Sequence, residues 1–505
     1  MSFEYEVIGG AVRITSYNGR DEELSIPDYI DGRPVEVIGR SAFNGNRHLK
    51  SLSMGSRVKI IEPSAFFYCT ELRHLTLNEG LESIGESAFH KCPISQVFLP
   101  QSLKSIGEKC FHAMENYDDF RQEIRVAGGN SHIFTDGHAI YTVNDRGNEL
   151  FAVFSADIKA FRSFNHNVRY EVAAGCKSIR RRSFANCRNL KVLTLPEGLE
   201  SIGEEAFTEC ISISEISLPD GLKEIGANAF LNTNIACFNI PASIEHIGEG
   251  AVAIREQWND RRYSKKLSIS GENAAYSVSD NKLIHTDAQG KKSLIADFAG
   301  DDVIFIPKGI EGICAKAYHH SMAVEIHVPN SVKSIHKDAF LKCNRLKRLY
   351  MDFLGERGCL YMPGAKCEYD VKPVHEQCVD CIHDSGEGWL FDFERYDSLF
   401  ASVSDKKEKV LMAVNRLKFA VRLEEKYRLH YLQYIKRHAA DAVKTVVEFD
   451  ELESLSALSE LGIFTPENID ALIDLANKAG KPELLSYLMN YKNSHFGVSE
   501  EDYEL

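Results

Sequence analysis

The stretch Asn189–Cys210 reads NLKVLTLPEGLESIGEEAFTEC, and most of the chain is built from variants of it. Its Ala-Phe pair, or a close variant, recurs with these residues at the aromatic position: Phe43, Phe66, Phe89, Phe111, Phe184, Phe207, Phe230, Val252, Tyr318 and Phe340. Within each of the three groups the step is 22 or 23 residues, and the gaps of 73 and 66 residues between groups are each close to three periods. A fixed period of this length predicts a solenoid, in which each repeat packs on its neighbours.

Each position of the unit has a physical role. Leu190–Leu195 form the pattern L-x-x-L-x-L, whose last two leucines alternate with Thr194 as in a short, half-buried strand. A proline such as Pro196 then ends the strand, because proline lacks an N–H group. The next step, L-x-x-I-G at Leu199–Gly203, ends in a glycine that we expect to take a positive φ where the chain bends. The Ala-Phe pair is expected to bury a small and a large residue at the opposite wall.

Three positions after the aromatic residue stands a small side chain that can form a hydrogen bond. This column comprises Asn46, Cys69, Cys92, Cys187, Cys210, Thr233, Ser321 and Cys343. Such a column can satisfy backbone groups of the adjoining loops that would otherwise be buried and unpaired. We therefore interpret its cysteines as structural, buried and reduced, and we expect thiol reagents to reach the later cysteines of the chain more readily.

At this point the pattern resembles a known family. The signature C-x-x-L-x-x-L-x-L-P-x-x-L-x-x-I-G-x-x-A-F, read at Cys187–Phe207, resembles the BspA-like variety of the leucine-rich repeat. The resemblance covers about residues 3–351, over which the units share period and register. It implies a mainly β and irregular solenoid, arc-shaped and right-handed, with a parallel sheet on its concave face. It implies little about the ligand, because this repeat is a general recognition scaffold.

The repeats are expected to form the first domain, residues 1–351. Two segments inside it, about 119–183 and 266–317, depart from the repeat and read as β-hairpin elaborations. Each begins with short strand patterns and contains a turn signal, Asp136-Gly137 in the first and Asp280-Asn281 in the second. Their lengths are near whole multiples of the period, so we expect them to continue the stack.

After residue 351 the 23-residue pattern stops. Residues 352–395 are interpreted as a linker that contains cysteines, and residues 495–505 as an acidic tail. Between them, residues 396–494 have helical periodicity and are expected to form an all-α domain. This domain weakly resembles ankyrin repeats and a helical module found behind leucine-rich repeats in gut Firmicutes proteins. We expect it to pack against the last repeats, because their apolar end must be covered.

Composition and charge narrow the function classes. The formal net charge of −14 argues against nonspecific nucleic-acid binding, which needs a basic surface. No apolar run reaches the ~18 residues of a membrane helix, and Met1–Gly10 has neither the basic nor the apolar region of a signal peptide. Thirteen cysteines suit reduced thiols better than a disulfide framework. We expect a cytoplasmic protein, the alternative being the cell surface if a leader was removed.

The late cysteines offer the sharpest chemical alternative. Cys378 and Cys381 have the C-x-x-C spacing of half a zinc site. The other half would have to come from Cys359 and Cys367, which stand eight positions apart, or from a nearby histidine. This spacing is irregular, so we expect no metal and no other cofactor, and zinc is kept as a weak alternative.

The usual catalytic motifs are not found in the sequence. It holds neither a G-x-S-x-G elbow nor an H-E-x-x-H helix nor a Gly-rich phosphate loop. His90 and His319 occupy equivalent repeat positions and are expected to lie in solvated loops. We therefore expect no enzymatic activity.

The preferred function is a non-enzymatic scaffold that recognises a protein or peptide on the concave face. In L-x-x-L-x-L, the residue between the last two apolar positions points away from the core, and strands stack about 4.8 Å apart. The candidate partner-binding residues at this position are Thr76, Phe98, Thr194, Ser217, Asn239, Phe305, His327 and Tyr350. Residues two positions earlier share the face, among them His74, Gln96, Glu215, Glu325 and Arg348.

Large exposed aromatic residues are enriched at interface hot spots, so Phe98, Phe305 and Tyr350 are the most informative candidates. The alternative is that each ring packs on a neighbouring repeat. Two rival functions stay open: a bacterial surface adhesin, and a metal-stabilised adaptor that uses the late cysteines. The sequence gives no partner identity and no oligomeric state.

Overall fold

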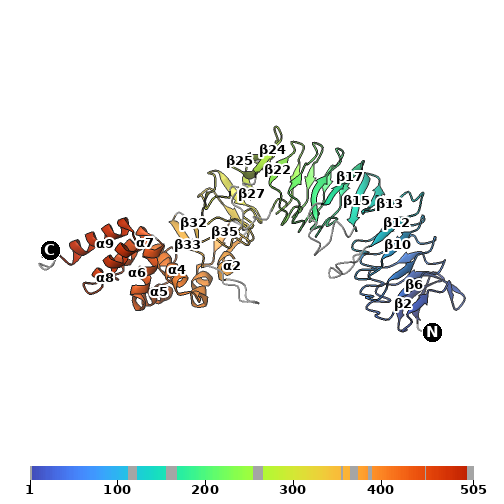
Figure 1. Cartoon of the computed structure of the whole chain (residues 1–505), viewed down its shortest axis with the longest axis horizontal. Coiled ribbons are helices and arrows are strands. Elements are labelled where there is room, and N and C mark those ends of the chain that lie inside the picture. The colour runs from blue at the N-terminus through green and yellow to red at the C-terminus, as the bar shows by residue number, and fades with distance from the viewer. Residues whose placement is uncertain are drawn as a thin grey trace. The chain divides into compact units, whose positions relative to one another are not determined.

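The computed structural model describes residues 3–111, 122–154, 168–253, 266–298, 300–353, 356–363, 374–384, 389–449 and 451–497. The chain forms two compact units, Met1–Asn281 (unit 1) and Lys282–Leu505 (unit 2). The described part of unit 1 consists of strands and turns, whereas unit 2 begins with strands and ends with helices (Figure 1).

Unit 1 begins with two strand layers. Each regular repeat contributes one strand to each layer. The L-x-x-L-x-L segments form a parallel layer of order β12-β10-β8-β6-β3. Its strands are β3 (Glu23–Ser25), β6 (Ser51–Ser53), β8 (His74–Thr76), β10 (Gln96–Leu99) and β12 (Glu123–Val126). The other layer contains β1 (Phe3–Ile8), β2 (Ala11–Tyr17), β5 (Arg33–Ile38), β7 (Ile60–Ile61), β9 (Ser83–Ile84) and β11 (Ser105–Ile106), with β4 (Tyr29–Ile30) paired to β5.

The second half of unit 1 repeats this plan. The L-x-x-L-x-L layer contains β16 (Val168–Glu171), β18 (Leu190–Thr194), β20 (Glu215–Ile216), β22 (Cys237–Ile240) and β24 (Lys266–Ile269). The other layer contains β13 (Ile133–Thr135), β14 (Ala139–Asn144), β15 (Gly147–Val153), β17 (Cys176–Ile179), β19 (Ser201–Ile202), β21 (Glu224–Ile225) and β23 (His246–Ile247), and β25 (Tyr276–Ser279) ends the unit. β13, β14 and β15 are antiparallel, and β15 then joins β17 in parallel. An antiparallel hairpin therefore continues the layer where the sequence predicts the first elaboration, whose bounds stay a prediction.

A column of aromatic rings fills the core between the layers. The ring centroids of Phe43 and Phe66 lie 4.6 Å apart, those of Phe66 and Phe89 5.0 Å, and those of Phe89 and Phe111 5.5 Å. All four side chains are buried. The 22- or 23-residue step brings each ring onto the one before it, which explains why this position is aromatic or large in every repeat.

The thiol column is buried as the sequence predicts. Each of four thiols donates a hydrogen bond to the carbonyl oxygen of an aromatic residue in the preceding repeat. The bonds run from Cys69 to Phe43 (3.1 Å), from Cys92 to Phe66 (3.0 Å), from Cys210 to Phe184 (2.9 Å) and from Cys343 to Tyr318 (2.8 Å). Burial also raises the pKa of Cys210 well above that of a free thiol. These cysteines therefore act as hydrogen-bond donors inside the solenoid, and not as nucleophiles.

The glycine of the I-G step has a different role from the predicted one. Gly203 and Gly226 do not have a positive φ. A Cβ atom on Gly226 would lie 2.5 Å from the backbone nitrogen of Glu204 in the preceding repeat. Glycine is required because two backbones pass each other at close range. The positive φ falls instead two residues before the aromatic position, as at Glu205 (54°) and Asn228 (56°).

Unit 2 has two strand layers of its own, which helices follow along the chain. One layer contains β26 (Lys282–Thr286), β27 (Lys292–Asp297), β29 (Ile310–Ile313) and β31 (Ser334–Ile335), of which β26 and β27 form an antiparallel hairpin. The L-x-x-L-x-L layer contains β28 (Val303–Phe305), β30 (Glu325–His327), β32 (Arg348–Phe353) and β33 (Glu356–Tyr361). β33 runs antiparallel to β32 and so ends the run of parallel strands in this layer.

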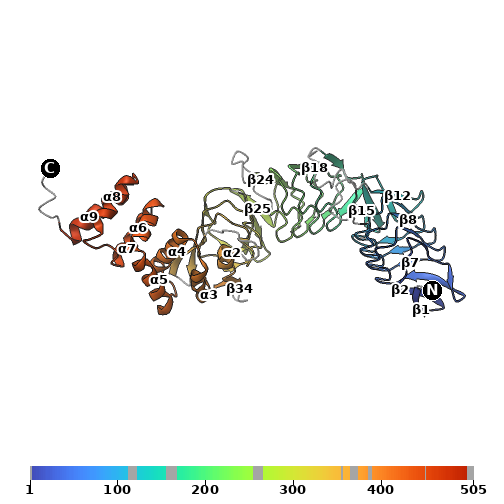
Figure 2. The same cartoon turned by 60° about the horizontal axis from the view of Figure 1, so that its bottom comes forward.

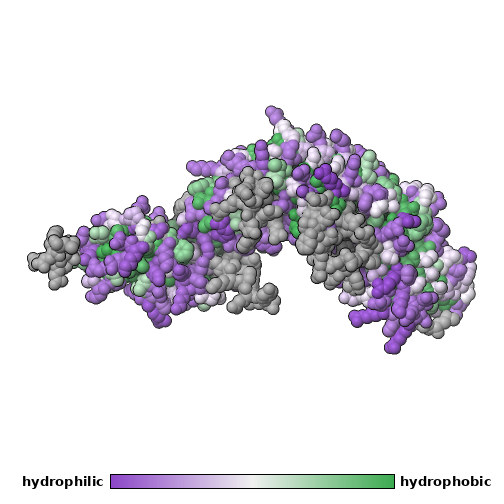
Figure 3. Space-filling view, viewed as in Figure 1, coloured by the Kyte–Doolittle hydropathy of each residue, from purple (hydrophilic) through white to green (hydrophobic). Residues whose placement is uncertain are grey.

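Helices follow these strands, and Figure 2 shows them from a second side. They are α4 (Lys406–Lys418), α5 (Glu425–Arg437), α6 (Ala439–Glu448), α7 (Leu452–Glu460), α8 (Ile469–Lys478) and α9 (Pro482–His495). One continuous cluster of buried side chains runs from Ile284 in β26 to Leu488 in α9. The helices therefore cover the apolar end of the last repeat, as the sequence predicts. Their outer surface is mostly hydrophilic on the face shown in Figure 3.

The described residues between 352 and 395 form short elements where the sequence predicts a linker, and the domain bounds stay a prediction. These residues hold β33, α2 (Val374–Val379), β34 (Ile382–Asp384), β35 (Trp389–Phe391) and the start of α3 (Phe393–Ser398), which the short helix η1 (Leu399–Ser402) follows. Cys378 and Cys381 are buried in the same core as the helices, and Cys359 is buried as well. The expectation that thiol reagents reach the later cysteines more readily is therefore wrong for these three residues. Elements of three to six residues are too short to show a hydrophobic period, so they could not be predicted from the sequence pattern.

A buried polar cluster connects α3 to α4 and α5. The guanidinium of Arg416 in α4 donates two hydrogen bonds to the carboxylate of Asp397, at 2.8 and 3.2 Å, and the hydroxyl of Tyr431 donates a third at 2.8 Å. Arg416 also donates to the carbonyl oxygens of Phe419 and Val421. Because nearly every donor and acceptor has a partner, the ion pair can be buried without an uncompensated charge.

Candidate partner-binding face

The outward positions of the L-x-x-L-x-L strands lie on the surface in both units. In β10, Val97 and Leu99 are buried whereas Gln96 and Phe98 are exposed. The same alternation exposes six of the eight candidate residues: Thr76, Phe98, Thr194, Ser217, Asn239 and Phe305. His327 and Tyr350 are half-buried. Strand geometry thus places all eight candidates on this surface, which we call the strand face, and their role in binding stays a prediction.

Phe98 is the prominent residue of the strand face at the start of unit 1. Its ring is 54% exposed, and β10 pairs with β12 so that Phe98 lies beside Arg125 and Gln96 beside Glu123. The carboxylate of Glu123 accepts hydrogen bonds from the Gln96 amide at 3.1 Å and from Nε of Arg125 at 2.7 Å. These planar polar groups are therefore held together next to an exposed ring. Glu123 and Arg125 could not be identified from the repeat pattern, because β12 lies outside the regular repeats.

The strand face of β18 and β20 is hollowed. A depression of about 700 Å³ is lined by side chains that include Thr194, Glu215, Ser217 and Cys237. Cys237 is exposed, in contrast to the buried thiols of the column. Small side chains at the outward positions of these repeats leave the strand face open.

In unit 2 the outward position is filled by three stacked rings, Phe305, His327 and Tyr350, which we call the ring ladder. The centroids of Phe305 and His327 lie 4.4 Å apart with an interplanar angle of 18°, and those of His327 and Tyr350 lie 4.4 Å apart at 5°. The ring of Phe419, at the end of α4, meets Tyr350 edge-on at 6.2 Å. The ladder is therefore supported at the Tyr350 end by the helices, whereas Phe305 is 66% exposed at the other end.

A polar row beside the ladder fixes its middle ring. The Nε2 atom of His327 lies 2.6 Å from Oε1 of Glu325, which precedes it on β30. Arg348 lies 3.9 Å from the other oxygen of Glu325 and also pairs with Glu451 at the start of α7. Burial raises the pKa of Tyr350, which keeps its hydroxyl protonated. The ring ladder is thus a rigid surface, and rigid aromatic groups lose little entropy on binding.

The weak metal candidates do not come together in the described residues. Cys359, Cys378 and Cys381 are buried, and no group of three or more possible ligands was found in the part of the chain that the structure describes. Cys367 lies outside the described residues. Cys381 donates a hydrogen bond to the carbonyl oxygen of Gln377 at 3.4 Å, and burial raises the pKa of Cys359 and Cys381 to about 12. These properties are those of protonated core thiols.

The two repeat histidines are not both in solvated loops. His319 is buried and meets the ring of His320 edge-on at 4.4 Å. His90 is half-buried and stacks on Phe67 at 5.2 Å. The sequence prediction is therefore wrong for His319, because the loop after each aromatic position packs against the next repeat. Among the described residues, no helix is long and apolar enough to span a membrane.

Comparison with known proteins agrees with this architecture. The sequence matches the family described as "BspA type Leucine rich repeat region (6 copies)" over residues 36–148, 177–290 and 302–353. No curated protein matches the chain.

Three solved structures illustrate the likeness. The pneumococcal vaccine antigen PcpA is 18% identical, covering 70% of this chain and 93% of its own, with a TM-score of 0.36. A leucine-rich repeat protein of Bacteroides ovatus is 18% identical, with coverage of 69% and 93% and a TM-score of 0.37. A leucine rich cell surface protein of Faecalibacterium prausnitzii is 19% identical, with coverage of 69% and 86% and a TM-score of 0.30. Since the family match spans more than half of the residues, the chain belongs to the BspA-type leucine-rich repeat family.

Proposed function

We propose that this protein is a non-enzymatic scaffold that binds a protein or peptide partner on the strand face, with the ring ladder of unit 2 as the centre of the contact. The observation that carries the proposal is Phe305. It is a large aromatic side chain, 66% exposed, on β28, which is hydrogen-bonded in parallel to β30. An exposed ring is left in water at a cost, and such rings are the usual anchors of protein interfaces.

The surroundings of the ladder support a protein partner. Val303, two positions before Phe305 on β28, is also exposed, so the edge of the ladder offers adjacent apolar surface. Glu325 and Arg348 follow in the same row and supply charges for a polar rim. An apolar centre with a charged rim is the ordinary composition of a protein interface.

The test compares two single substitutions of exposed aromatic residues. The full chain is used as bait for extracts of the native cell, and the captured partner is then titrated against each variant. Phe305→Ala should weaken binding by about 2 kcal/mol, the usual scale of a hot spot. Tyr29→Ala is the matched control, because Tyr29 is 51% exposed but lies outside the strand face.

The outcome that contradicts the proposal is an unchanged affinity of Phe305→Ala with a melting temperature like that of wild type. Tyr350→Ala is less informative, because Tyr350 also packs against Phe419 and its loss should lower stability. A fall in both stability and affinity for Tyr350→Ala, with a fall in affinity alone for Phe305→Ala, is the expected pattern.

For location, we propose the cytoplasm, with the cell surface as the alternative. The thiol column supports this proposal, since four of its cysteines act through their S–H groups, and thiols stay reduced in the cytosol. Fractionation of the native cell with detection of the full chain is the direct measurement. Recovery in the surface fraction would favour the adhesin-like role instead.

A further inference from the structure

The first repeats of unit 1 carry a second surface whose chemistry differs from that of the ring ladder. We propose that the strand face of β3, β6, β8 and β10 binds an uncharged polysaccharide chain, which crosses the strands and ends its contact on the ring of Phe98. This inference goes beyond the proposed protein partner and uses residues of the strand face that lie outside the ring ladder.

Small polar side chains make up most of this surface. The row that leads to Phe98 consists of small hydroxyl side chains, Ser25, Ser53 and Thr76, in register on neighbouring strands. The parallel row contains Ser51, His74 and Gln96, with Glu23 at its start. We call these two rows the hydroxyl strip. Hydroxyl and amide groups both donate and accept hydrogen bonds, which suits the hydroxyl groups of a sugar.

The hydroxyl strip ends in an aromatic ring. Phe98 stands at the end of the row and is 54% exposed. The face of an aromatic ring is the negative part of its quadrupole, and the C–H groups on one face of a pyranose carry partial positive charge. Next to the ring of Phe98 on β10 and β12 lie Gln96, Glu123 and Arg125, whose planar groups can bind the hydroxyl groups of a sugar. A ring with such neighbours suits a sugar better than an apolar side chain.

The spacing of the strands bears on which kind of polymer fits the strip. The strands of the strip lie about 4.8 Å apart, which is close to the length of one sugar ring in an extended polysaccharide. A chain of sugars that crosses the strands can therefore place one ring over each repeat. An extended peptide advances about 3.3 Å per residue and falls out of step with the strands. The register thus favours a polysaccharide over a peptide on this surface.

The strip carries little charge. The whole chain has a formal net charge of −14, yet the strip has few charged side chains, and Glu123 is paired with Arg125 at its end. A charged polymer of either sign would find little complementary charge there. The binding of an uncharged polymer is not weakened by this lack of charge. A long, shallow, polar surface also suits a polymer better than a small ligand, which needs a concave pocket.

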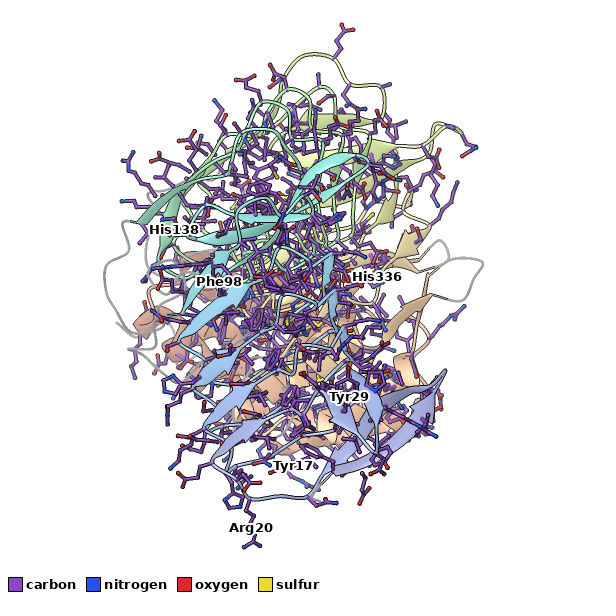
Figure 4. The ribbon with its side chains drawn as sticks, turned by 90° about the vertical axis from the view of Figure 1, so that its right-hand side faces the viewer. Tyr17, Arg20, Tyr29, Phe98, His138 and His336 are labelled. Atoms are coloured by element: carbon purple, nitrogen blue, oxygen red, sulfur yellow. The ribbon has the colours of Figure 1, made fainter. Side chains whose placement is uncertain are left out.

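The experiment is affinity electrophoresis of the full chain in native gels that contain hydroxyethyl cellulose, glucomannan, dextran or laminarin. Wild type should be retarded by at least one of them. Phe98→Ala should raise the dissociation constant in that gel at least tenfold. Tyr29→Ala is the matched control and should migrate like wild type, because Tyr29 and Phe98 lie on opposite sides in Figure 4.

Two further variants make the result decisive. Ser53→Trp fills the middle of the strip and should abolish retardation, with circular dichroism and melting temperature showing that it folds. Phe305→Ala should be retarded like wild type, which separates this proposal from the protein-binding role of the ring ladder. The proposal is overturned if none of the four gels retards wild type, or if Phe98→Ala or folded Ser53→Trp is retarded as strongly. Loss of a protein partner by Phe98→Ala without any retardation would assign the strip to protein instead.

Discussion

The regular repeats and the junction between residues 352 and 421 are stabilised in different ways. In the repeats the same contacts recur: a ring on a ring, a thiol on a carbonyl oxygen, and a glycine against a backbone. In the junction the polar contacts are made once, as in the Asp397–Arg416–Tyr431 cluster and in the hydroxyl of Tyr361 that donates to Glu408 at 2.8 Å. Stability is therefore distributed in the repeats and concentrated in the junction.

This difference predicts where single substitutions are most costly. The largest effect is expected for Arg416→Ala, which leaves the buried carboxylate of Asp397 without its cation. Removing one partner of a buried pair costs about 3–5 kcal/mol. Arg73→Ala in the repeats is the matched control. Its pair with Glu71 is exposed, and such pairs contribute at most about 1 kcal/mol. Urea unfolding of both variants measures the difference, and equal losses would remove the distinction between the two regions.

The second effect tests the repeated contact itself. Gly226→Ala puts a Cβ atom 2.5 Å from the backbone nitrogen of Glu204, and relieving such overpacking costs about 1–3 kcal/mol. Gly221→Ala is the control, because the nearest atom to its Cβ would be 3.5 Å away. Melting temperatures of the two variants are compared. If both behave alike, close approach is not the reason for glycine at this step.

Gly226 also shows how much of the structure could be predicted from the sequence. The position of the glycine in the repeat was evident from the pattern, but its reason was not. A turn that needs positive φ and a close approach between repeats both select glycine. Only the neighbouring backbone distinguishes them, and that backbone belongs to another repeat.

The same limit applies to the two binding surfaces. Strand alternation was enough to place Phe98, Phe305, His327 and Tyr350 on the strand face. It could not show that Phe419 supports the ladder, because helix and strand are joined only by tertiary packing. The short strands and helices of residues 356–402 could not be predicted for a related reason, since each has only three to six residues and is too short to show a hydrophobic period.

A smaller effect, dependent on pH, is expected where the first strands meet the repeats. Glu62 accepts hydrogen bonds from Arg13 at 3.0 and 2.5 Å and from the backbone of Arg40 at 2.7 Å, and the Arg13 bond lowers its pKa. A lowered folded-state pKa contributes stability that is present above the unfolded-state value and lost as the pH falls through the folded-state value. Glu62→Gln should therefore cost about 1 kcal/mol near pH 7.

The pH profile supplies the control for Glu62→Gln. The difference in unfolding free energy between wild type and variant should shrink as the pH falls below the ordinary pKa of a glutamate, about 4.3, because the lowered folded-state pKa of Glu62 ties its stabilisation to the ionised carboxylate. Denaturant titrations at about pH 7, 5 and 3 measure this difference. A difference that stays constant with pH would mean that the loss comes from packing and not from charge.

The smallest expected effect has the opposite sign and uses the repetition of the solenoid. Lys342 has a φ of 60° two residues after the aromatic position, as Lys91 (62°) and Glu209 (61°) do in their repeats. The left-handed conformation costs about 1–2 kcal/mol for a residue with a Cβ atom, whereas glycine costs about 0.5–1 kcal/mol in backbone entropy. Lys342→Gly should therefore raise stability by about 0.5 kcal/mol. Lys337→Gly, at a position without positive φ, should lower it. Because the same conformation recurs, Lys91→Gly should give a similar gain in another repeat, and a gain at one site only would mean that the strain is not shared along the solenoid.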